Sequence, residues 1–438
     1  MRLSILLAAT LIAVSGCKRA SNPPSDPPGN VTVLPGDGVA LLSWAPLPGL
    51  TYWIFYRPGT TVNAAEPGSI AVKNAQEPRA VTGLLNDLQY AFVMNATNDD
   101  SAAGPSSPVV TTATRLAGDS WVTGAPIGAT PQNLNALAFS GARYVTVGDA
   151  GAILEGDFAY GSPSPNLGVT LWMQALVLPV NFTENLRSVI FNGSFVALGE
   201  NGSVLTSADG VSWGANVPIT VNGAPVTGMN GIAFGALGNT GFYVAVGNGG
   251  QIFTSTNLAA PWVQANSNTT EDLTSIATLN GAFFVTGTNG TLLVSPDLTV
   301  WNSQTTGLPP GTTLRAVAFM PNAPPTAVRF VAVGDAGAVV TSTSVPSTGQ
   351  GTWTPTLLPG AQNLRSVTVG GATGLRFMAV GLGGAAVFGD SVINNVPVSS
   401  IQWSTPAQQS PTGDLSSVLF FLGQYLAVGA TGANAVSH

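Results

Sequence analysis

The sequence predicts an all-β protein with a seven-bladed β-propeller over residues 119–438, and three observations predict this fold class. Glycine is abundant, with 53 residues in 438, and the hydrophobic positions show little of the 3.6-residue period typical of amphipathic helices. One short phrase occurs seven times: an apolar run, Gly, two residues, Gly and a second apolar run. Its copies recur about every 47 residues, which is the spacing of propeller blades rather than of leucine-rich repeats.

The repeated phrase predicts a β-hairpin in each copy. The first copy reads VTVGDAGAIL and spans Val145 to Leu154. Glycine reaches positive φ without a Cβ penalty, so two β-rich runs joined through Gly, Asp or Asn are typical of hairpins. The glycine pairs are Gly148/Gly151, Gly199/Gly202, Gly247/Gly250, Gly287/Gly290, Gly334/Gly337, Gly381/Gly384 and Gly429/Gly432.

One strand is expected before each hairpin and another after it. The upstream strands begin at Leu134, Leu186, Met229, Leu273, Leu314, Leu364 and Leu415. A tryptophan follows six of the seven hairpins, at Trp172, Trp213, Trp262, Trp301, Trp353 and Trp403. Each unit is therefore expected to supply four strands, the last of which carries the Trp.

The seventh unit indicates how the ring closes. Its hairpin ends at His438, six residues after Gly432, and leaves no room for a fourth strand. Trp121 stands ahead of the first unit, in a segment that matches the one around Trp353. We expect the strand of Trp121 to complete the last blade, because a ring closed in this way leaves no open sheet edge.

The chain carries few charges. Charged residues make up 8% of the sequence, and the net charge is −7 with 13 Lys and Arg together. Nucleic-acid binding is not expected, since neutralising phosphates requires clustered cations. With His438 as its one histidine and Cys17 as its one cysteine, the chain is expected to hold no disulfide, no metal and no cofactor.

The N terminus resembles a bacterial lipoprotein signal. Residues 3–14 form an apolar run too short to span a bilayer, and residues 14–17 read Val-Ser-Gly-Cys. The resemblance implies that residues 1–16 are a signal peptide and that Cys17 is acylated and anchors the chain to a membrane. Lys18 implies the outer membrane, by similarity to the sorting rule of enteric bacteria. An ordinary secretory peptide with an incidental cysteine is the alternative.

Two segments precede the ring. Residues 17–28 are polar and Pro-rich and are expected to form a tether. Residues 29–115 contain six β-rich segments, VTVL, VALLSW, TYWIFYR, RAVTGL, QYAFVMNAT and PVVTTAT. These predict a small β-sandwich without the cysteine pair of antibody domains.

The same block resembles a fibronectin type III domain. The resemblance rests above all on Trp44, Pro46, Tyr52 and Leu84, which stands six residues before Tyr90. It implies that Trp44 is a core residue, that Tyr90 forms a tyrosine corner, and that the domain is a non-catalytic spacer or adhesion module.

Two turns carry a further signature. Residues 206–213, TSADGVSW, and 294–301, VSPDLTVW, resemble Asp-box (BNR) repeats. An Asp side chain that binds backbone amides two residues on stabilises such a turn, so Asp209 and Asp297 are expected to form turns. The whole set of units resembles the photosystem II assembly and stability factor family and the wider group of BNR or YVTN-like propellers in bacterial lipoproteins. This resemblance implies a non-catalytic protein-binding or assembly scaffold.

Three arginines share one register. Arg187, Arg315 and Arg365 are each the second residue of the upstream strand. Equivalent positions in a ring converge around its axis, so we predict a patch that binds an anion or an acidic partner. The alternative is that their side chains cover the surface between blades and cap carbonyl groups.

A sialidase-like or glycan-binding propeller is the alternative function. Such an enzyme needs three arginines around a carboxylate, a Tyr paired with Glu, and an Asp acid. Of Tyr144, Tyr160, Tyr243 and Tyr425, three fall within second-strand core runs. We therefore predict no catalytic residues and a monomeric, outer-membrane-associated lipoprotein that binds a protein partner.

Overall fold

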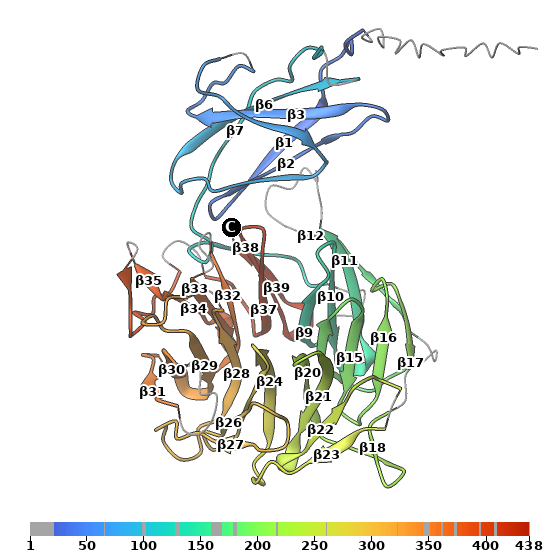
Figure 1. Ribbon diagram of the computed structural model, residues 1–438, viewed down its shortest axis with the longest axis vertical. Coiled ribbons are helices and arrows are strands. Elements are labelled where there is room, and N and C mark those ends of the chain that lie inside the picture. The colour runs from blue at the N-terminus through green and yellow to red at the C-terminus, as the bar shows by residue number, and fades with distance from the viewer. Residues whose placement is uncertain are drawn as a thin grey trace, which may run out of the picture. The chain divides into compact units, whose positions relative to one another are not determined.

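The computed structural model consists of β-strands, short 3-10 turns and connecting segments in the residues it describes (Figure 1). These residues are 22–64, 66–98, 102–127, 132–158, 169–177, 182–215, 218–259, 261–321, 323–344, 351–360, 362–371, 375–393, 396–406 and 410–437. Cys17 and the predicted signal peptide lie outside them. Within the described ranges, no helix is long and apolar enough to cross a membrane.

Backbone contacts divide the chain into two compact units. One comprises Met1–Thr32, Ser43–Arg79 and Gln89–Thr111, and the other comprises Val33–Leu42, Ala80–Leu88 and Thr112–His438. The domain boundary predicted near residues 115–119 stays a prediction.

The N-terminal strands form two sheets. The first has the order β1–β2–β5, with β1 (Gly29–Gly36), β2 (Val39–Ala45) and β5 (Arg79–Thr82). The second has the order β4–β3–β6–β7, with β3 (Thr51–Pro58), β4 (Ile70–Ala75), β6 (Gln89–Thr97) and β7 (Val110–Ala113). All six predicted strands are present. Sequence reasoning missed β4, because this edge strand is mostly exposed and its sequence, IAVKNA, lacks apolar alternation.

The aromatic residues predicted to form the N-terminal core are buried. Trp44 on β2 has its ring centroid 5.3 Å from that of Tyr52 on β3. Tyr90 on β6 lies 6.5 Å from Tyr56, again between ring centroids. Both pairs join apolar faces in tilted geometry, which is favourable for aromatic rings. The fibronectin type III assignment stays a prediction.

Seven sheets of three to five strands follow in the described part of the chain, and we number them in the order of the sequence. The first contains β9 (Leu134–Phe139), β10 (Arg143–Gly148), β11 (Ile153–Phe158) and β12 (Val169–Gln174). The second contains β13 (Leu176–Val177), β14 (Leu186–Phe191), β15 (Phe195–Gly199), β16 (Val204–Ser207) and β17 (Ser212–Ala215). The third contains β20 (Met229–Leu237), β21 (Thr240–Gly247), β22 (Ile252–Ser255) and β23 (Val263–Ala265).

The remaining four sheets repeat the same antiparallel order. The fourth contains β24 (Leu273–Leu279), β25 (Ala282–Gly287), β26 (Leu292–Ser295) and β27 (Asn302–Ser303). The fifth contains β28 (Leu314–Phe319), β29 (Phe330–Gly334), β30 (Ala338–Ser342) and β31 (Thr354–Leu357). The sixth contains β32 (Leu364–Gly370), β33 (Arg376–Gly381) and β34 (Ala386–Asp390). The seventh contains β37 (Leu415–Phe421), β38 (Gln424–Gly429), β39 (Asn434–Ser437) and β8 (Trp121–Thr123).

Short elements connect or extend the sheets. Two ribbons pair β18 (Thr220–Val221) with β19 (Ala224–Pro225) and β35 (Val392–Ile393) with β36 (Val396–Pro397). The 3-10 turns are η1 (Asp149–Gly151), η2 (Asn248–Gly250), η3 (Asp335–Gly337), η4 (Leu382–Gly384) and η5 (Ala430–Gly432). Each lies within a Gly-x-x-Gly phrase, between the second and third strands of its sheet.

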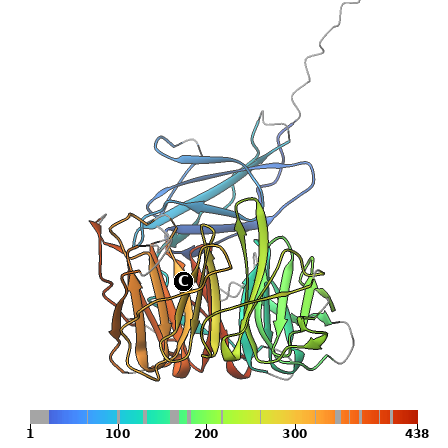
Figure 2. The ribbon, with the colours of Figure 1, turned by 60° about the horizontal axis from the view of Figure 1, so that its bottom comes forward.

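The sheets are arranged around an axis in the order of the sequence (Figures 1 and 2). One edge strand of each sheet is its innermost, and it is the strand that begins the repeated unit. The innermost strands contact one another in the series β9, β14, β20, β24, β28, β32 and β37, and β37 contacts β9. Apolar side chains fill the space between neighbouring sheets, as where Val145 of the first packs with Phe195 and Trp213 of the second. Burial of this apolar surface between the sheets stabilises the ring.

The N-terminal strand of this region belongs to the seventh sheet. Strand β8 pairs antiparallel with β39, with Trp121 opposite Ser437. Trp121 is fully buried, and its indole Nε1 donates a hydrogen bond to the Gly118 carbonyl at 3.2 Å. The predicted pairing of the Trp121 strand with the last hairpin is thus what the structure shows.

The two glycines of each Gly-x-x-Gly phrase are needed for different reasons. The first meets the chain that enters its own inner strand. A Cβ on Gly148 would lie 2.0 Å from the Asn133 carbonyl oxygen, and one on Gly381 would lie 2.0 Å from that of Asn363. The second glycine has the predicted positive φ, 72° at Gly151, in the left-handed region that favours glycine.

The positions of the tryptophans relative to the outer strands differ in part from those predicted. Trp172 and Trp213 lie in the fourth strands of their units, β12 and β17, but Trp262, Trp301 and Trp353 directly precede β23, β27 and β31. The expectation that each last strand carries its Trp is therefore wrong for these sheets. Burial of the indole against the core between sheets, rather than strand pairing, decides its position.

The sixth sheet lacks a full outer strand in the described residues. Beyond β34, its pairing is an isolated bridge between Phe388 and Ser404, next to Trp403.

Candidate functional site

A polar cavity of about 510 Å³ lies on the axis of the ring, and we call it the axial cavity. All seven sheets contribute to its lining, because the second residue of each innermost strand points into it. These residues are Asn135, Arg187, Asn230, Thr274, Arg315, Arg365 and Ser416. The structure therefore brings the three predicted arginines together at one cavity.

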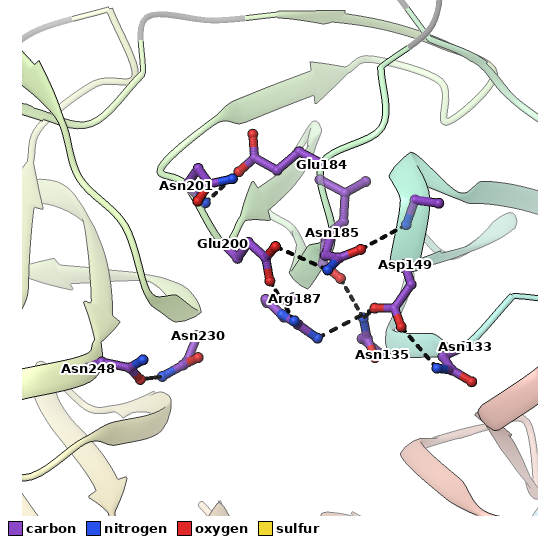
Figure 3. Close-up of polar contacts among 12 residues, drawn as sticks. Asn133, Asn135, Asp149, Glu184, Asn185, Arg187, Glu200, Asn201, Asn230 and Asn248 are labelled. Carbon is purple, nitrogen blue, oxygen red and sulfur yellow. Dashed lines mark hydrogen bonds and ion pairs between the residues drawn. The ribbon is translucent and has the colours of Figure 1, made fainter.

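Arg187 is neutralised by two carboxylates (Figure 3). Its Nη2 lies 2.5 Å from Oε2 of Glu200, which follows the first glycine of its own sheet. Its Nη1 lies 3.4 Å from Oδ1 of Asp149, at the same position of the preceding sheet. A guanidinium held by two carboxylates offers little to a ligand.

Arg315 is also paired. Its Nε and Nη2 bind the two carboxylate oxygens of Asp335 at 3.1 and 2.6 Å. Such a two-point ion pair is the strong geometry for an arginine and a carboxylate. Arg315 therefore adds little free positive charge to the cavity.

Arg365 differs from the other two arginines. Among the described residues its ion-pair partner is Asp335, at 4.0 Å between Nη1 and Oδ1, and that carboxylate already binds Arg315. Burial lowers the pKa of Arg365 below its ordinary value, and the charge of Arg315 lowers it further. Arg365 is thus a charged donor without a close carboxylate of its own.

Asparagine and threonine at the same register act differently. The Asn135 side-chain amide donates to the Leu186 carbonyl of the next sheet at 2.8 Å. Thr274 donates from its hydroxyl to the Leu314 carbonyl at 2.6 Å. These short side chains cap carbonyls between sheets, which is the role considered as the alternative for the arginines. The arginines bind carboxylates instead.

Sequence reasoning missed a set of hydrogen bonds at the rim of the cavity. The residue before the innermost strand accepts a hydrogen bond from a turn amide of the preceding sheet. The donors and acceptors are Ala150 to Asn185, Gly249 to Asp272, Ala336 to Asn363, Gly383 to Asp414 and Thr431 to Asn133. An Asn or Asp directly before the Leu of five strand motifs was the available signal. These bonds fix the turns that form the rim.

The Asp-box residues form turns away from the axial cavity. Asp209 accepts hydrogen bonds from the amides of Val211 and Ser212, and these bonds lower the pKa of its carboxyl. Asp297 accepts from the amides of Thr299 and Val300, and the latter bond contributes most to lowering its pKa. The hydrogen bonds match the predicted turn-forming role.

The described tyrosines of the ring do not line the axial cavity. Tyr425 is fully buried, and burial raises the pKa of its hydroxyl well above the ordinary value. The Tyr243 hydroxyl accepts a hydrogen bond from Asn192 at 2.8 Å. Among the described residues, no group of three or more His, Cys, Asp or Glu side chains is placed to hold a metal ion.

Comparison with known proteins decides the fold. No protein-family profile and no curated protein matches the sequence. YCF48 from Cyanidioschyzon merolae matches with 16% identity and a TM-score of 0.53, over 73% of this chain and 99% of that one. The WD40 β-propeller domain of Doa1 matches with 10% identity and a TM-score of 0.50, over 73% and 97%. The C-terminal region has a β-propeller fold.

A further match to this propeller is a structure of YCF48 bound to D1 peptide. It has 15% identity and a TM-score of 0.51, over 72% of this chain and 96% of that one. At such identity the likeness shows the fold alone. The predicted resemblance to photosystem II assembly factors is supported at that level.

Proposed function

We propose that this protein is a non-catalytic binding scaffold whose axial cavity takes an acidic segment of a protein partner. The observation that carries the proposal is Arg365, whose nearest carboxylate lies 4.0 Å away and is already engaged by Arg315. A partner carboxylate bound to Arg365 would gain a charge-assisted hydrogen bond without breaking an existing one.

Other donors around the cavity support a peptide ligand. The side-chain nitrogen of Asn248 and the hydroxyl of Ser416 line the cavity and have no protein hydrogen-bond partner within the described ranges. Together with Arg365 they offer amide, hydroxyl and guanidinium groups, which suit a peptide backbone as well as a carboxylate. The cavity volume lies within the range of about 300–1,000 Å³ of ligand sites.

The peptide complex of YCF48 supports the same kind of ligand. It is a protein of similar fold that holds a peptide. A rigid ring that presents fixed side chains at its axis loses little conformational entropy when a ligand binds. This preorganisation favours a binding role for the fold.

The finer architecture belongs to the same proposal. The seven sheets are the blades of one closed propeller, residues 29–115 are a fibronectin type III module, and Cys17 carries the lipid that holds the protein at the outer membrane. Support comes from the contact series of the innermost strands, the burial of Trp44 and Tyr90, and the lipoprotein-like signal sequence.

A sialidase-like or glycan-binding propeller is the second candidate. The convergence of three arginines on one cavity favours it. Arg187 and Arg315 are already bound by carboxylates of the protein, so a sialic acid carboxylate would have to displace these partners. Hydrolysis of a fluorogenic sialoside, abolished by Arg315→Ala, would establish this alternative.

Selection from random peptides tests the proposed function. Random heptapeptides are displayed in two formats, within a longer chain or with a free C terminus. Both sets are selected on the full chain and on its Arg365→Gln variant. We expect enrichment of peptides with Asp, Glu or a free C-terminal carboxylate on the wild type, and its loss on the variant. Arg187→Gln serves as the matched control, because that arginine is already neutralised. The same enrichment on Arg365→Gln would contradict the proposal.

A further inference from the structure

Three carboxylates line the axial cavity, those of Asp149, Asp272 and Asp414. Oδ1 of Asp149 lies 3.4 Å from Nη1 of Arg187. Burial lowers the pKa of Arg365, and the charge of Asp414 acts on that pKa in the opposite direction, so these two groups attract each other. Asp272, directly before the first strand of the fourth sheet, forms no ion pair within the described ranges. The negative charge of Asp272 is therefore the least compensated in the lining.

The fold does not require a charge at this position. In five sheets the residue before the innermost strand accepts a hydrogen bond from a turn amide, and in three of them it is Asn133, Asn185 or Asn363. Asp272 accepts the equivalent bond through Oδ1 from the Gly249 amide at 2.8 Å. Since a neutral amide oxygen accepts this bond in other sheets, the carboxylate of Asp272 supplies a charge that the turn does not need.

The bond from Gly249 leaves the other carboxylate oxygen of Asp272 open to a ligand. The side chain is exposed, and among the described residues no donor binds its Oδ2. The side-chain oxygen of Asn230 is a second acceptor without a described donor. The Nδ2 of this asparagine donates to Asn248 and, at 2.8 Å, to the carbonyl of Leu273, the residue after Asp272 (Figure 3). The fourth sheet and its neighbour thus present two acceptors to the cavity, and one of them is charged.

These acceptors suit a primary ammonium group. The ammonium of a lysine is a compact charge with three donors and no acceptor. An arginine guanidinium binds best to both oxygens of one carboxylate, whereas one oxygen of Asp272 already binds an amide. A calcium ion takes about six to eight oxygen ligands, and the described residues place no group of three or more His, Cys, Asp or Glu side chains to hold a metal.

We propose that the axial cavity binds a segment that carries both charges, with its carboxylate bound to Arg365 and the ammonium group of a lysine bound to Asp272. This inference rests on the proposed function and adds to it a second charged residue of the partner. The two binding groups belong to the sixth and fourth sheets and face one cavity. A sphere of 510 Å³ is about 10 Å across, and an extended peptide spans about 7–10 Å with two or three residues. The lysine is therefore expected two or three residues from the carboxylate.

Labelled hexapeptides test the inference by fluorescence anisotropy with the full chain. Each carries one carboxylate, either an Asp side chain in an amidated peptide or a free C terminus, and one Lys two or three residues from it. Matched peptides have norleucine in place of Lys, which keeps the aliphatic stem and removes the ammonium group. We expect the best Lys peptide to bind about fivefold more tightly than its match, since an ion pair that stays open to water is worth about that ratio.

Two protein variants locate the binding of the ammonium group. Asp272→Asn removes the charge and keeps an acceptor for the Gly249 amide, as Asn363 provides one for a turn amide of the fifth sheet. This variant is expected to abolish the preference for Lys over norleucine. Asp414→Asn is the matched control, because it removes the same charge at the equivalent position of the seventh sheet. The preference for Lys should remain in this control.

The outcomes distinguish the two proposals. Equal binding of Lys and norleucine peptides, with both weakened by Arg365→Gln, would overturn the inference and leave the proposed function standing. A preference for Lys that both Asp→Asn variants reduce equally would also overturn the inference, because it would reflect the general negative charge around the cavity. Binding that Arg365→Gln does not change would overturn the proposed function. Absence of binding by all peptides at millimolar concentration would overturn both.

Discussion

Arg187 and Arg365 occupy the same position of two sheets and have similarly exposed side chains, 34% and 30%. Arg187 has carboxylate oxygens at 2.5 and 3.4 Å, whereas the nearest to Arg365 is at 4.0 Å. The residue after the first glycine explains the difference, because it is Glu200 in the sheet of Arg187 and Leu382 in the sheet of Arg365. The register of the strand places an arginine at the axis. The residue after the first glycine of the same sheet decides whether the charge of that arginine is available to a ligand.

Replacing Leu382 with glutamate should abolish the difference between Arg365 and Arg187, and we expect it to change peptide affinity more than any other substitution proposed below. In Leu382→Glu, Arg365 would gain a carboxylate as Arg187 has from Glu200. We expect the affinity for an acidic peptide to fall about thirtyfold, since the new carboxylate both neutralises Arg365 and repels the ligand. Anisotropy titrations measure this, with Leu382→Gln as the uncharged control. Unchanged affinity in Leu382→Glu would show that the ligand charge is bound elsewhere.

Replacing Arg365 and Arg187 in turn should show how much each arginine contributes to the affinity for an acidic peptide. Arg365→Gln is expected to weaken acidic-peptide binding about tenfold, because a hydrogen bond to a charged group is lost. Arg187→Gln should change it less than about twofold, since its charge is already used within the protein. Isothermal titration calorimetry at one salt concentration compares them. Equal losses in both variants would argue for a shared cationic patch.

The same pair of variants should show the opposite order in stability. Arg187→Gln leaves Glu200 and Asp149 without their cation, so we expect the free energy of unfolding to fall by about 1 kcal/mol. Arg365→Gln should leave it nearly unchanged or raise it slightly. Urea unfolding followed by tryptophan fluorescence provides the measurement. A larger loss for Arg365→Gln would contradict the assigned pairing.

The smallest expected effect concerns carboxylates held by backbone amides instead of arginines. Amide hydrogen bonds lower the pKa of Asp209 below about 3.9, the unfolded value. Its charge therefore stabilises the fold above that pH, and this stabilisation is lost as the pH falls through the folded pKa. We expect Asp209→Asn to cost about 0.5 kcal/mol at pH 6 and progressively less as the pH falls below about 3.9.

Urea unfolding of wild type and Asp209→Asn across this pH range is the check. Asp87→Asn, a change at a carboxylate outside the ring, is the matched control. A pH-independent difference between the wild type and Asp209→Asn would show that the turn depends on shape rather than on charge.

Much of the fold could be predicted because its signals are local and repeated. The second glycine needs positive φ within its own turn, and Trp121 belongs to a segment similar to that around Trp353. Strand β4 was not predictable, because its IAVKNA sequence pairs at a sheet edge without an apolar pattern. The bond from the Ala150 amide to Asn185 was also missed, since it joins groups 35 residues apart.

For the site, the shared register of Arg187, Arg315 and Arg365 could be predicted from the sequence, and their convergence at the axis follows from the ring. The carboxylates that pair with them could not be predicted. Asp149 reaches Arg187 from the preceding sheet, 38 residues earlier, and Asp335 lies between Arg315 and Arg365 and binds the first.

By itself the sequence determined the repeat, its turns and the chemistry placed at each register, because backbone conformation and strand alternation depend on neighbouring residues. Tertiary structure alone decided which arginine keeps an available charge. This availability depends on distances of a few ångströms between side chains of different sheets, and only the packed ring sets those distances.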